Sequence, residues 1–210
     1  MAWFYGVYLA EKHIEAALEL VRFLGEPDYL RRPHITIRGP YERKQDALLE
    51  KLQYHDRQIL VKGITAFFAD SQNTVLLDCD LPDKERVWRK PNYPDGRPHI
   101  TLYDGKSRHM ALNLRSALKA CKWMFRVPVT EIKLIEKKID PNEVFPEIFE
   151  SVSLLYKEVM FEEFKLDNIR KLSEVDVVFC VSRLAAYISK NYPPSPLTSQ
   201  PRRKRAPGPS

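Results

Sequence analysis

The pentapeptide Arg-Pro-His-Ile-Thr occurs twice in this 210-residue chain, at positions 32–36 and 97–101. On a β-strand alternate side chains share a face, so each copy would place its histidine beside its threonine and turn its isoleucine toward a core. Histidine exchanges protons near neutral pH, and a pair of histidines can hold one base and one acid at once. Threonine hydroxyls can donate hydrogen bonds to the oxygens of a phosphoryl group. The candidate catalytic residues are therefore His34, Thr36, His99 and Thr101.

This combination suits the cleavage of a phosphodiester through a ribose 2′ or 3′ oxygen. The reaction needs a base for the nucleophile, an acid for the departing oxygen and donors for the phosphoryl group. Two imidazoles and two hydroxyls supply all of these without a metal ion or a cofactor. Two copies of the pentapeptide in matching surroundings favour a catalytic role for its histidines, whereas a single histidine usually has a structural role.

The neighbouring sequence predicts the elements that would hold the two copies. Alternating residues predict strands, and apolar residues at helical spacing predict helices. Because strand, helix and strand recur around each copy, we expect a two-lobed duplicated core of the α+β class that ends near Ile139. The expected strands lie within residues 1–10, 32–41, 63–68, 74–79, 93–105 and 125–135, and the expected helices within 11–24, 42–54 and 107–123.

The domain organisation follows from these elements and from a change of character after them. Residues 1–139 form the expected core, with lobes of roughly 1–60 and 61–139 between which strands can be exchanged. Residues 140–192 read as a helical extension, for which packing against the core is favoured and binding of a protein partner is the alternative. Residues 193–210 are rich in proline, serine and basic residues, which predicts a disordered basic tail.

Composition excludes several classes of protein. The chain is 44% hydrophobic and 30% charged, as globular proteins are. It has no uninterrupted apolar run of roughly 20 residues that could cross a membrane, and no basic leader of a secretory signal, so we expect a cytoplasmic protein. Four of its six net positive charges come from the tail, where weak contact with a polyanion is the functional alternative to an unspecific basic end. Those four residues are Arg202, Arg203, Lys204 and Arg205.

The two His-Ile-Thr words resemble the paired HxT signatures of the two-histidine (2H) phosphoesterase superfamily, and the resemblance covers residues 1 to about 139. That superfamily includes the RNA 2′,3′-cyclic phosphodiesterases, also called 2′-5′ RNA ligases. The resemblance implies a bilobal arrangement of antiparallel sheets with outer helices around a central groove. It also implies metal-independent catalysis with His34 and His99 as the acid-base pair and with Thr36 and Thr101 on the phosphate.

Other side chains are candidates for binding the substrate or are expected to be structural. Aromatic residues near the two copies can stack on a base, and basic residues there can neutralise a phosphate. Tyr5 and Tyr8 point to opposite sides of their expected strand, so at most one of them faces the groove. The candidate substrate-binding residues are Tyr5, Arg38, Tyr41, Arg97 and Tyr103, with Trp88 and Tyr93 as further nucleotide contacts. Histidines 13, 55 and 109 are expected to face solvent without binding metal, and Cys79, Cys121 and Cys180 to be buried free thiols.

We therefore expect a monomeric phosphoric diester hydrolase that acts on an RNA end or a nucleotide, at a 2′,3′-cyclic phosphate or a 2′-5′ linkage. Two alternatives stay open at this point. One is an enzyme that hydrolyses cyclic di- or oligonucleotide second messengers, and the other is an RNA-binding module without catalysis.

Overall fold

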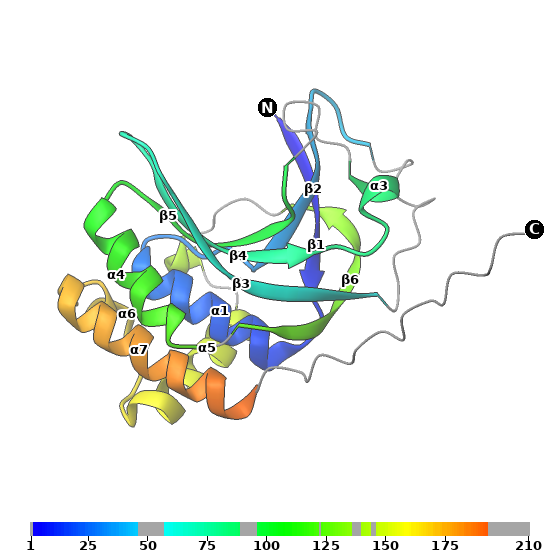
Figure 1. Cartoon of the computed structure of the whole chain (residues 1–210). Helices are drawn as coiled ribbons and strands as arrows, with labels where there is room; N and C mark the ends of the chain where they lie inside the picture. The colour runs from blue at the N-terminus through cyan, green and yellow to red at the C-terminus, as the bar shows by residue number, and fades with distance from the viewer. Residues whose placement is uncertain are drawn as a thin grey trace, which may run out of the picture.

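The computed structural model describes residues 2–45, 57–88, 96–121, 123–135, 140–143 and 146–192 (Figure 1). The strands are β1 (Trp3–Leu9), β2 (His34–Tyr41), β3 (Gln58–Phe68), β4 (Asn73–Asp80), β5 (His99–Gly105) and β6 (Phe125–Leu134). The helices are α1 (Lys12–Gly25), α3 (Lys84–Val87), α4 (Arg108–Lys119), α5 (Pro146–Met160), α6 (Leu166–Ile169) and α7 (Glu174–Asn191), with a short 3₁₀ helix at Pro141–Glu143.

All of these strands pair antiparallel in one sheet, in the order β1-β2-β5-β4-β3-β6, and β6 closes the sheet by pairing with β1. The β3–β4 hairpin and the outer ends of β1 and β2 project as two arms (Figure 1). At the junction of the arms, β2 meets β5 through the pair Ile35 and Ile100. The expected α+β class is confirmed, and the strands of both expected lobes share one hydrogen-bonded sheet.

The sequence patterns located most elements correctly. The strand and helix expected within residues 1–24 are β1 and α1, and the expected hairpin is β3–β4. Local capping explains where two helices begin: the Ser107 side chain accepts a hydrogen bond from the Met110 amide at α4, and a reciprocal capping box joins Ser173 and Asp176 at α7. The helix expected within residues 42–54 falls largely outside the described residues.

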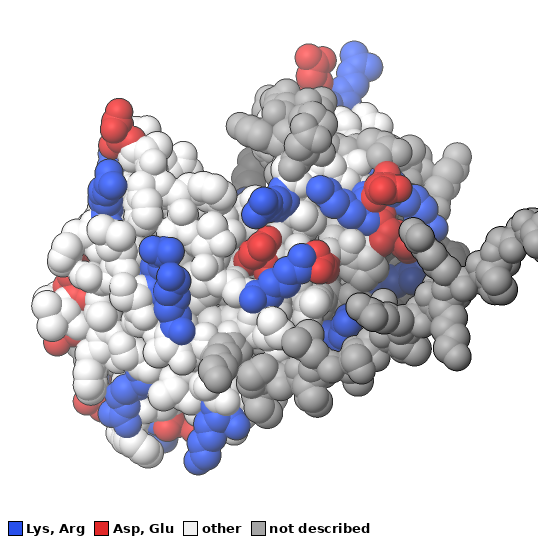
Figure 2. All heavy atoms as spheres, in the orientation of Figure 1, with Lys and Arg blue, Asp and Glu red and all other residues white. Residues whose placement is uncertain are grey.

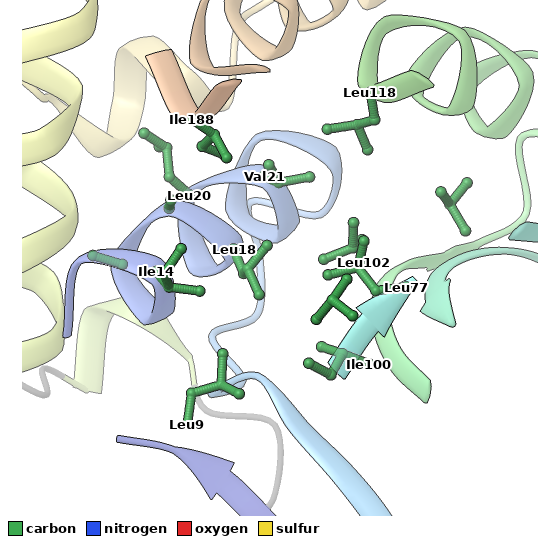
Figure 3. Packing of buried hydrophobic residues seen from close by; sticks show 14 of the residues in the cluster. Leu9, Ile14, Leu18, Leu20, Val21, Leu77, Ile100, Leu102, Leu118 and Ile188 are labelled. Atoms are coloured by element: carbon green, nitrogen blue, oxygen red, sulfur yellow. The ribbon is translucent and has the colours of Figure 1, made fainter. Parts of the chain in front are cut away.

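Helix α1 is apolar on almost every side, which is typical of a helix enclosed by the protein. Eight of its apolar residues are at most 5% exposed, and they are Ile14, Ala16, Ala17, Leu18, Leu20, Val21, Phe23 and Leu24. Leu18 points toward the strand residues Leu77 and Ile100, whereas Leu20 points toward Ile188 of α7 (Figure 3). The helix therefore lies between the sheet and the C-terminal helices.

Helices α5, α6 and α7 occupy the segment for which a helical extension was expected. Their apolar faces join the same hydrophobic cluster as α1, α4 and the sheet, through residues such as Val152, Val181 and Leu184, which are fully buried. Helix α5 packs against α1, and α7 packs against both α1 and α4. Within the described residues, no helix combines the length and the apolar character needed to span a membrane.

Candidate active site

The two copies of the pentapeptide, which we call the first and second histidine words, are residues 32–36 and 97–101. They lie side by side on β2 and β5 and run in opposite directions. Because Ile35 pairs with Ile100, the antiparallel register puts His34 opposite Thr101 and Thr36 opposite His99. Residues directly opposite one another in such a pair have Cα atoms about 4.5–5.5 Å apart. A local twofold axis thus relates the two words. We name the side of β2 and β5 that carries His34, Thr36, His99 and Thr101 the HxT face.

The isoleucines between these residues show which way the HxT face points. Ile35 and Ile100 are fully buried in the hydrophobic cluster, so they turn away from it, toward α1 and the rest of the core. Figure 2 shows the surface hollowed beside the arm that the β3–β4 hairpin forms in Figure 1. The threonines are half-buried, and neither hydroxyl has a hydrogen-bond partner within the described part of the chain.

Both imidazoles are held in the same orientation. Nδ1 of His34 lies 2.8 Å from the carbonyl oxygen of Arg32, and Nδ1 of His99 lies 2.8 Å from that of Arg97. A carbonyl oxygen can only accept a hydrogen bond, so Nδ1 carries the proton and, in a neutral ring, Nε2 carries the lone pair. The arginine two residues before each histidine therefore acts through its backbone. The sequence repeat encodes this tautomer twice.

The surroundings of the two histidines differ. His34 is buried, at 8% exposure, whereas His99 is half-buried. The pKa of His34 is lowered to about 3, mainly by burial and also by the nearby Arg31, Arg22 and His99, whereas the hydrogen bond to the Arg32 carbonyl opposes the shift. The influence of His99 on His34 agrees with the closeness that the strand register requires. In the unliganded site, His34 is therefore a neutral imidazole at physiological pH.

Because His34 is neutral when buried and protonated in the unfolded chain below about pH 6.5, its burial should make folding stability depend on pH. The unfolded state binds more protons between about pH 6.5 and pH 3, so this contribution is intact above that window and is lost as the pH falls through it. We expect the free energy of unfolding, measured by urea denaturation, to decrease from pH 7 to pH 5 by about 2 kcal/mol more in the wild type than in H34Q.

The exposed His13 on α1 provides the matched control for this measurement. H13Q should keep the pH dependence of the wild type, since it leaves the buried ring in place. Equal pH dependence in the wild type and in H34Q would contradict the described environment of His34.

Strand β1 supplies the wall beside the first word. Tyr8 lies opposite His34 with the ring centroids 5.6 Å apart, and its hydroxyl donates to the Leu134 carbonyl. Gly6 lies opposite Thr36, where a Cβ atom would come within 2.7 Å of the Ile35 carbonyl oxygen, so the position accepts only glycine without a backbone shift. Tyr8 is thus the β1 residue whose side chain lies next to His34.

The prediction that Tyr5 lines the substrate groove is wrong. Tyr5 is fully buried in the hydrophobic cluster, and its hydroxyl accepts a hydrogen bond from the backbone amide of Gln45 at 2.7 Å. Alternation showed that at most one of Tyr5 and Tyr8 could face the groove, and the register of β1 against β2 selects Tyr8.

The prediction that Tyr103 shares the face of His99 is also wrong. The register of β5 against β4 shifts between Leu76 and Val75, so strict alternation is not kept from Thr101 to Tyr103. Tyr103 is buried, contacts the position of Gly25 at the end of α1, and accepts a hydrogen bond from the Ser107 amide through its hydroxyl. It stabilises the junction between β5 and the helices.

Arg38 has a structural role instead of the predicted phosphate contact. A register irregularity separates the Gly6–Thr36 pair from the Tyr5–Arg38 pair, so alternation from His34 does not extend to Arg38. The side chain is buried and donates from Nε to the Val87 carbonyl at 3.0 Å, at the end of α3. It anchors this short helix to β2.

The remaining candidates have varied positions. Tyr41 is half-buried with its ring centroid 6.1 Å from that of Tyr5, and Arg97 is exposed, so their contact with substrate stays a prediction. Trp88 is buried beneath the Lys84 ammonium, which argues against the further nucleotide contact considered for it. Tyr93, His55 and the basic residues 202–205 lie outside the described residues.

The described histidines outside the HxT face lie at the surface, as expected. His13 is exposed, and His109 is exposed with its Nδ1 2.8 Å from the Glu174 carboxylate. The three cysteines are free and buried, as expected.

Sequence reasoning missed two arginines beside the HxT face, Arg22 and Arg31. Arg22, on the inner side of α1, is 5% exposed and donates from Nη1 to the Thr101 carbonyl at 3.0 Å. Burial and the neighbouring Arg31 lower its pKa to about 10. The two residues come from α1 and from the segment before β2, so only the packing of helix on sheet brings them together. The doublet Arg31-Arg32, where the second copy has Gly96-Arg97, was the one available signal.

Comparison of this chain with family models, with curated proteins and with solved structures gives no match.

Proposed function

We propose that this protein is a phosphodiesterase of the two-histidine type, which cleaves 2′,3′-cyclic phosphate or 2′-5′ phosphodiester bonds in RNA ends or nucleotides. The single observation that carries the proposal is the antiparallel pairing of the two histidine words through Ile35 and Ile100. This pairing puts two imidazoles of the same tautomer and two hydroxyls on one face. The likeness of the words to the HxT signatures of the 2H phosphoesterases supports the same assignment.

The chemistry divides between the two histidines. The burial of His34 favours its neutral form, so we assign it the base that takes a proton from the attacking water or ribose hydroxyl. The less buried His99 protonates the departing ribose oxygen through Nε2. The hydroxyls of Thr36 and Thr101 donate to the non-bridging oxygens, where negative charge grows in the transition state. The acid, the base and the donors come from the chain, so the proposed reaction needs no metal ion.

In the hydrolysis of a cyclic phosphate, the water oxygen bonds to phosphorus as the bond from phosphorus to one ribose oxygen breaks. The proton from water goes to His34, and the proton on His99 goes to that ribose oxygen. The product is a ribose phosphate monoester. In the cleavage of a 2′-5′ linkage, the adjacent 3′ hydroxyl replaces water as the nucleophile.

The test is a panel of 2′,3′-cyclic nucleotides, 2′-5′ and 3′-5′ dinucleotides and cyclic dinucleotides, incubated with the full-length protein in excess EDTA. Products are separated by chromatography and identified by mass. We expect turnover of a 2′,3′-cyclic nucleotide or a 2′-5′ dinucleotide in the presence of the chelator. Consumption of cyclic dinucleotides alone would replace the proposal with the second-messenger alternative. Inactivity of the folded protein across the panel would reject the proposal.

The setting of the reaction belongs to the proposal as well. We place the protein in the cytoplasm as a monomer, with an RNA end or a nucleotide as its substrate. The basic residues Arg202, Arg203, Lys204 and Arg205 would add weak attraction for RNA, which falls as salt increases.

A further inference from the structure

The site is nearly symmetric in its chemistry but not in its charge. Each word carries the same histidine, the same threonine and the same hydrogen bond from the ring to the backbone. The residue before each word differs, since Arg31 precedes the first copy and Gly96 precedes the second. At this position, a positively charged side chain therefore precedes only the first copy.

Arg31 lies at the end of the HxT face, immediately before β2. The guanidinium is close enough to His34 and to Arg22 to lower the pKa of each, and it interacts with Tyr8, Asp104 and Glu26. These groups place it between the start of β2, the end of β5 and the last turn of α1.

The guanidinium of Arg31 has an unsatisfied donor within the described part of the chain. It is half-buried, and its buried Nε has no hydrogen-bond partner in the described part of the protein. Nor does an ion pair join it to a carboxylate within the same residues, although Asp104 and Glu26 are near enough to act on its charge. Three other arginines around the site do have partners: Arg22 on the Thr101 carbonyl, Arg32 on Glu15 and Arg38 on the Val87 carbonyl.

An unsatisfied and partly buried guanidinium beside a second one is costly for the protein, because both lose hydration and they repel each other. A phosphate would relieve both effects, since arginine binds phosphate oxygens through paired and charge-assisted hydrogen bonds. The scissile phosphate belongs between the two words, where the threonine hydroxyls lie. Arg31 stands three residues before His34, outside the word, so a phosphate on it would be a second one.

We propose that Arg31 binds a second phosphate of the substrate, one that flanks the scissile phosphate on the His34 side of the HxT face. This inference rests on the proposed function and narrows its substrate class to nucleotides or RNA ends that carry an additional phosphate. It also makes the two ends of the face different, because Arg31 precedes only the first of the two words.

The kinetic test compares adenosine 2′,3′-cyclic phosphate with its 5′-phosphorylated form. For the wild type, we expect kcat/KM to be about 10- to 100-fold higher on the 5′-phosphorylated form, the range of one charge-assisted hydrogen bond or a pair of them. R31Q should lose most of this preference through a higher KM and should change little on the substrate without the 5′-phosphate. R31K, which keeps the charge without the paired donors, should recover part of it. R126Q, which removes an exposed arginine from β6, should keep the full preference.

A binding experiment separates this inference from the proposed function. Isothermal titration calorimetry would compare adenosine 3′,5′-bisphosphate with adenosine 3′-monophosphate on the wild type and R31Q, with thermal melting to show that both are folded. A preference of the wild type for the bisphosphate that R31Q loses would support the inference even if the substrate panel showed no turnover. Equal affinity for both ligands in the wild type, or an equal loss on both in R31Q, would overturn it whether or not the protein is an enzyme.

Discussion

Replacing His99 or His34 with alanine should lower kcat by about 10³-fold on the substrate that the panel identifies, within the 10²–10⁴ that positioned acids and bases contribute. Each imidazole sits opposite the threonine of the other word, so the loss of either ring leaves the phosphate donors in place. We therefore expect KM to change much less than kcat. The measurement is steady-state kinetics in EDTA with thermal melting of each variant.

The two substitutions should differ when the leaving group changes. A nitrophenolate departs without a proton, so a nitrophenyl ester of the same nucleotide does not need the acid. On that ester the loss in H99A should shrink to below about tenfold, whereas the loss in H34A should persist. The opposite pattern would exchange the roles of the two histidines, and full activity of both variants on every substrate would remove them from the mechanism.

Deleting the C-terminal helices should unfold the protein. A chain that ends at Ile139 lacks Val152, Val181 and Leu184, each fully buried against the rest of the cluster. A buried aliphatic side chain contributes about 1.5–3 kcal/mol, so a few of them equal the 5–15 kcal/mol by which a domain is usually stable. We expect the shortened chain to be insoluble or to lack a cooperative thermal transition.

A single substitution tests the same claim with less disturbance. L184A removes a fully buried side chain from α7 and should lower the free energy of unfolding by about 2–5 kcal/mol in urea denaturation. V175A, at a 77% exposed position of the same helix, should change it by less than about 0.5 kcal/mol. A cooperative, stable chain without residues 140–192, together with a neutral L184A, would show that these helices are an appendage and no part of the core.

Periodicity predicted most of the fold because most of the elements are locally consistent. The helical spacing of apolar residues located α1 and α4, and alternation in the two words placed Ile35 and Ile100 in the core. The same alternation supports the HxT face itself, since the short segments from His34 to Thr36 and from His99 to Thr101 contain no register shift.

Alternation failed where the strands are irregular. A shift in β5 leads Tyr103 into the core, and another between β1 and β2 intervenes before Arg38. Such bulges depend on the partner strand, and no residue in the chain signals them. The roles of Arg38 and Arg22 were also beyond local patterns, because their hydrogen-bond acceptors lie 49 and 79 residues further along the chain.

The sequence also could not show how extensively the C-terminal helices pack against the core. The sequence shows that residues 140–192 favour helices, and their apolar stripes show that something must cover them. It does not show that α5 and α7 are the helices that pack against α1. Only the three-dimensional arrangement makes these helices part of one core with the site.

The most direct test of the central claim is the rate constant of the H34A/H99A double variant beside both single variants, measured in single turnovers on the preferred substrate in EDTA. If the two imidazoles act together on one phosphate, the double variant should be slower than the slower single variant by less than about tenfold, because residues that act as a unit are not additive. If the rate loss of the double variant equals the product of the two single-variant losses, the two histidines contribute independently. Turnover by the double variant at the wild-type rate would contradict the proposed active site.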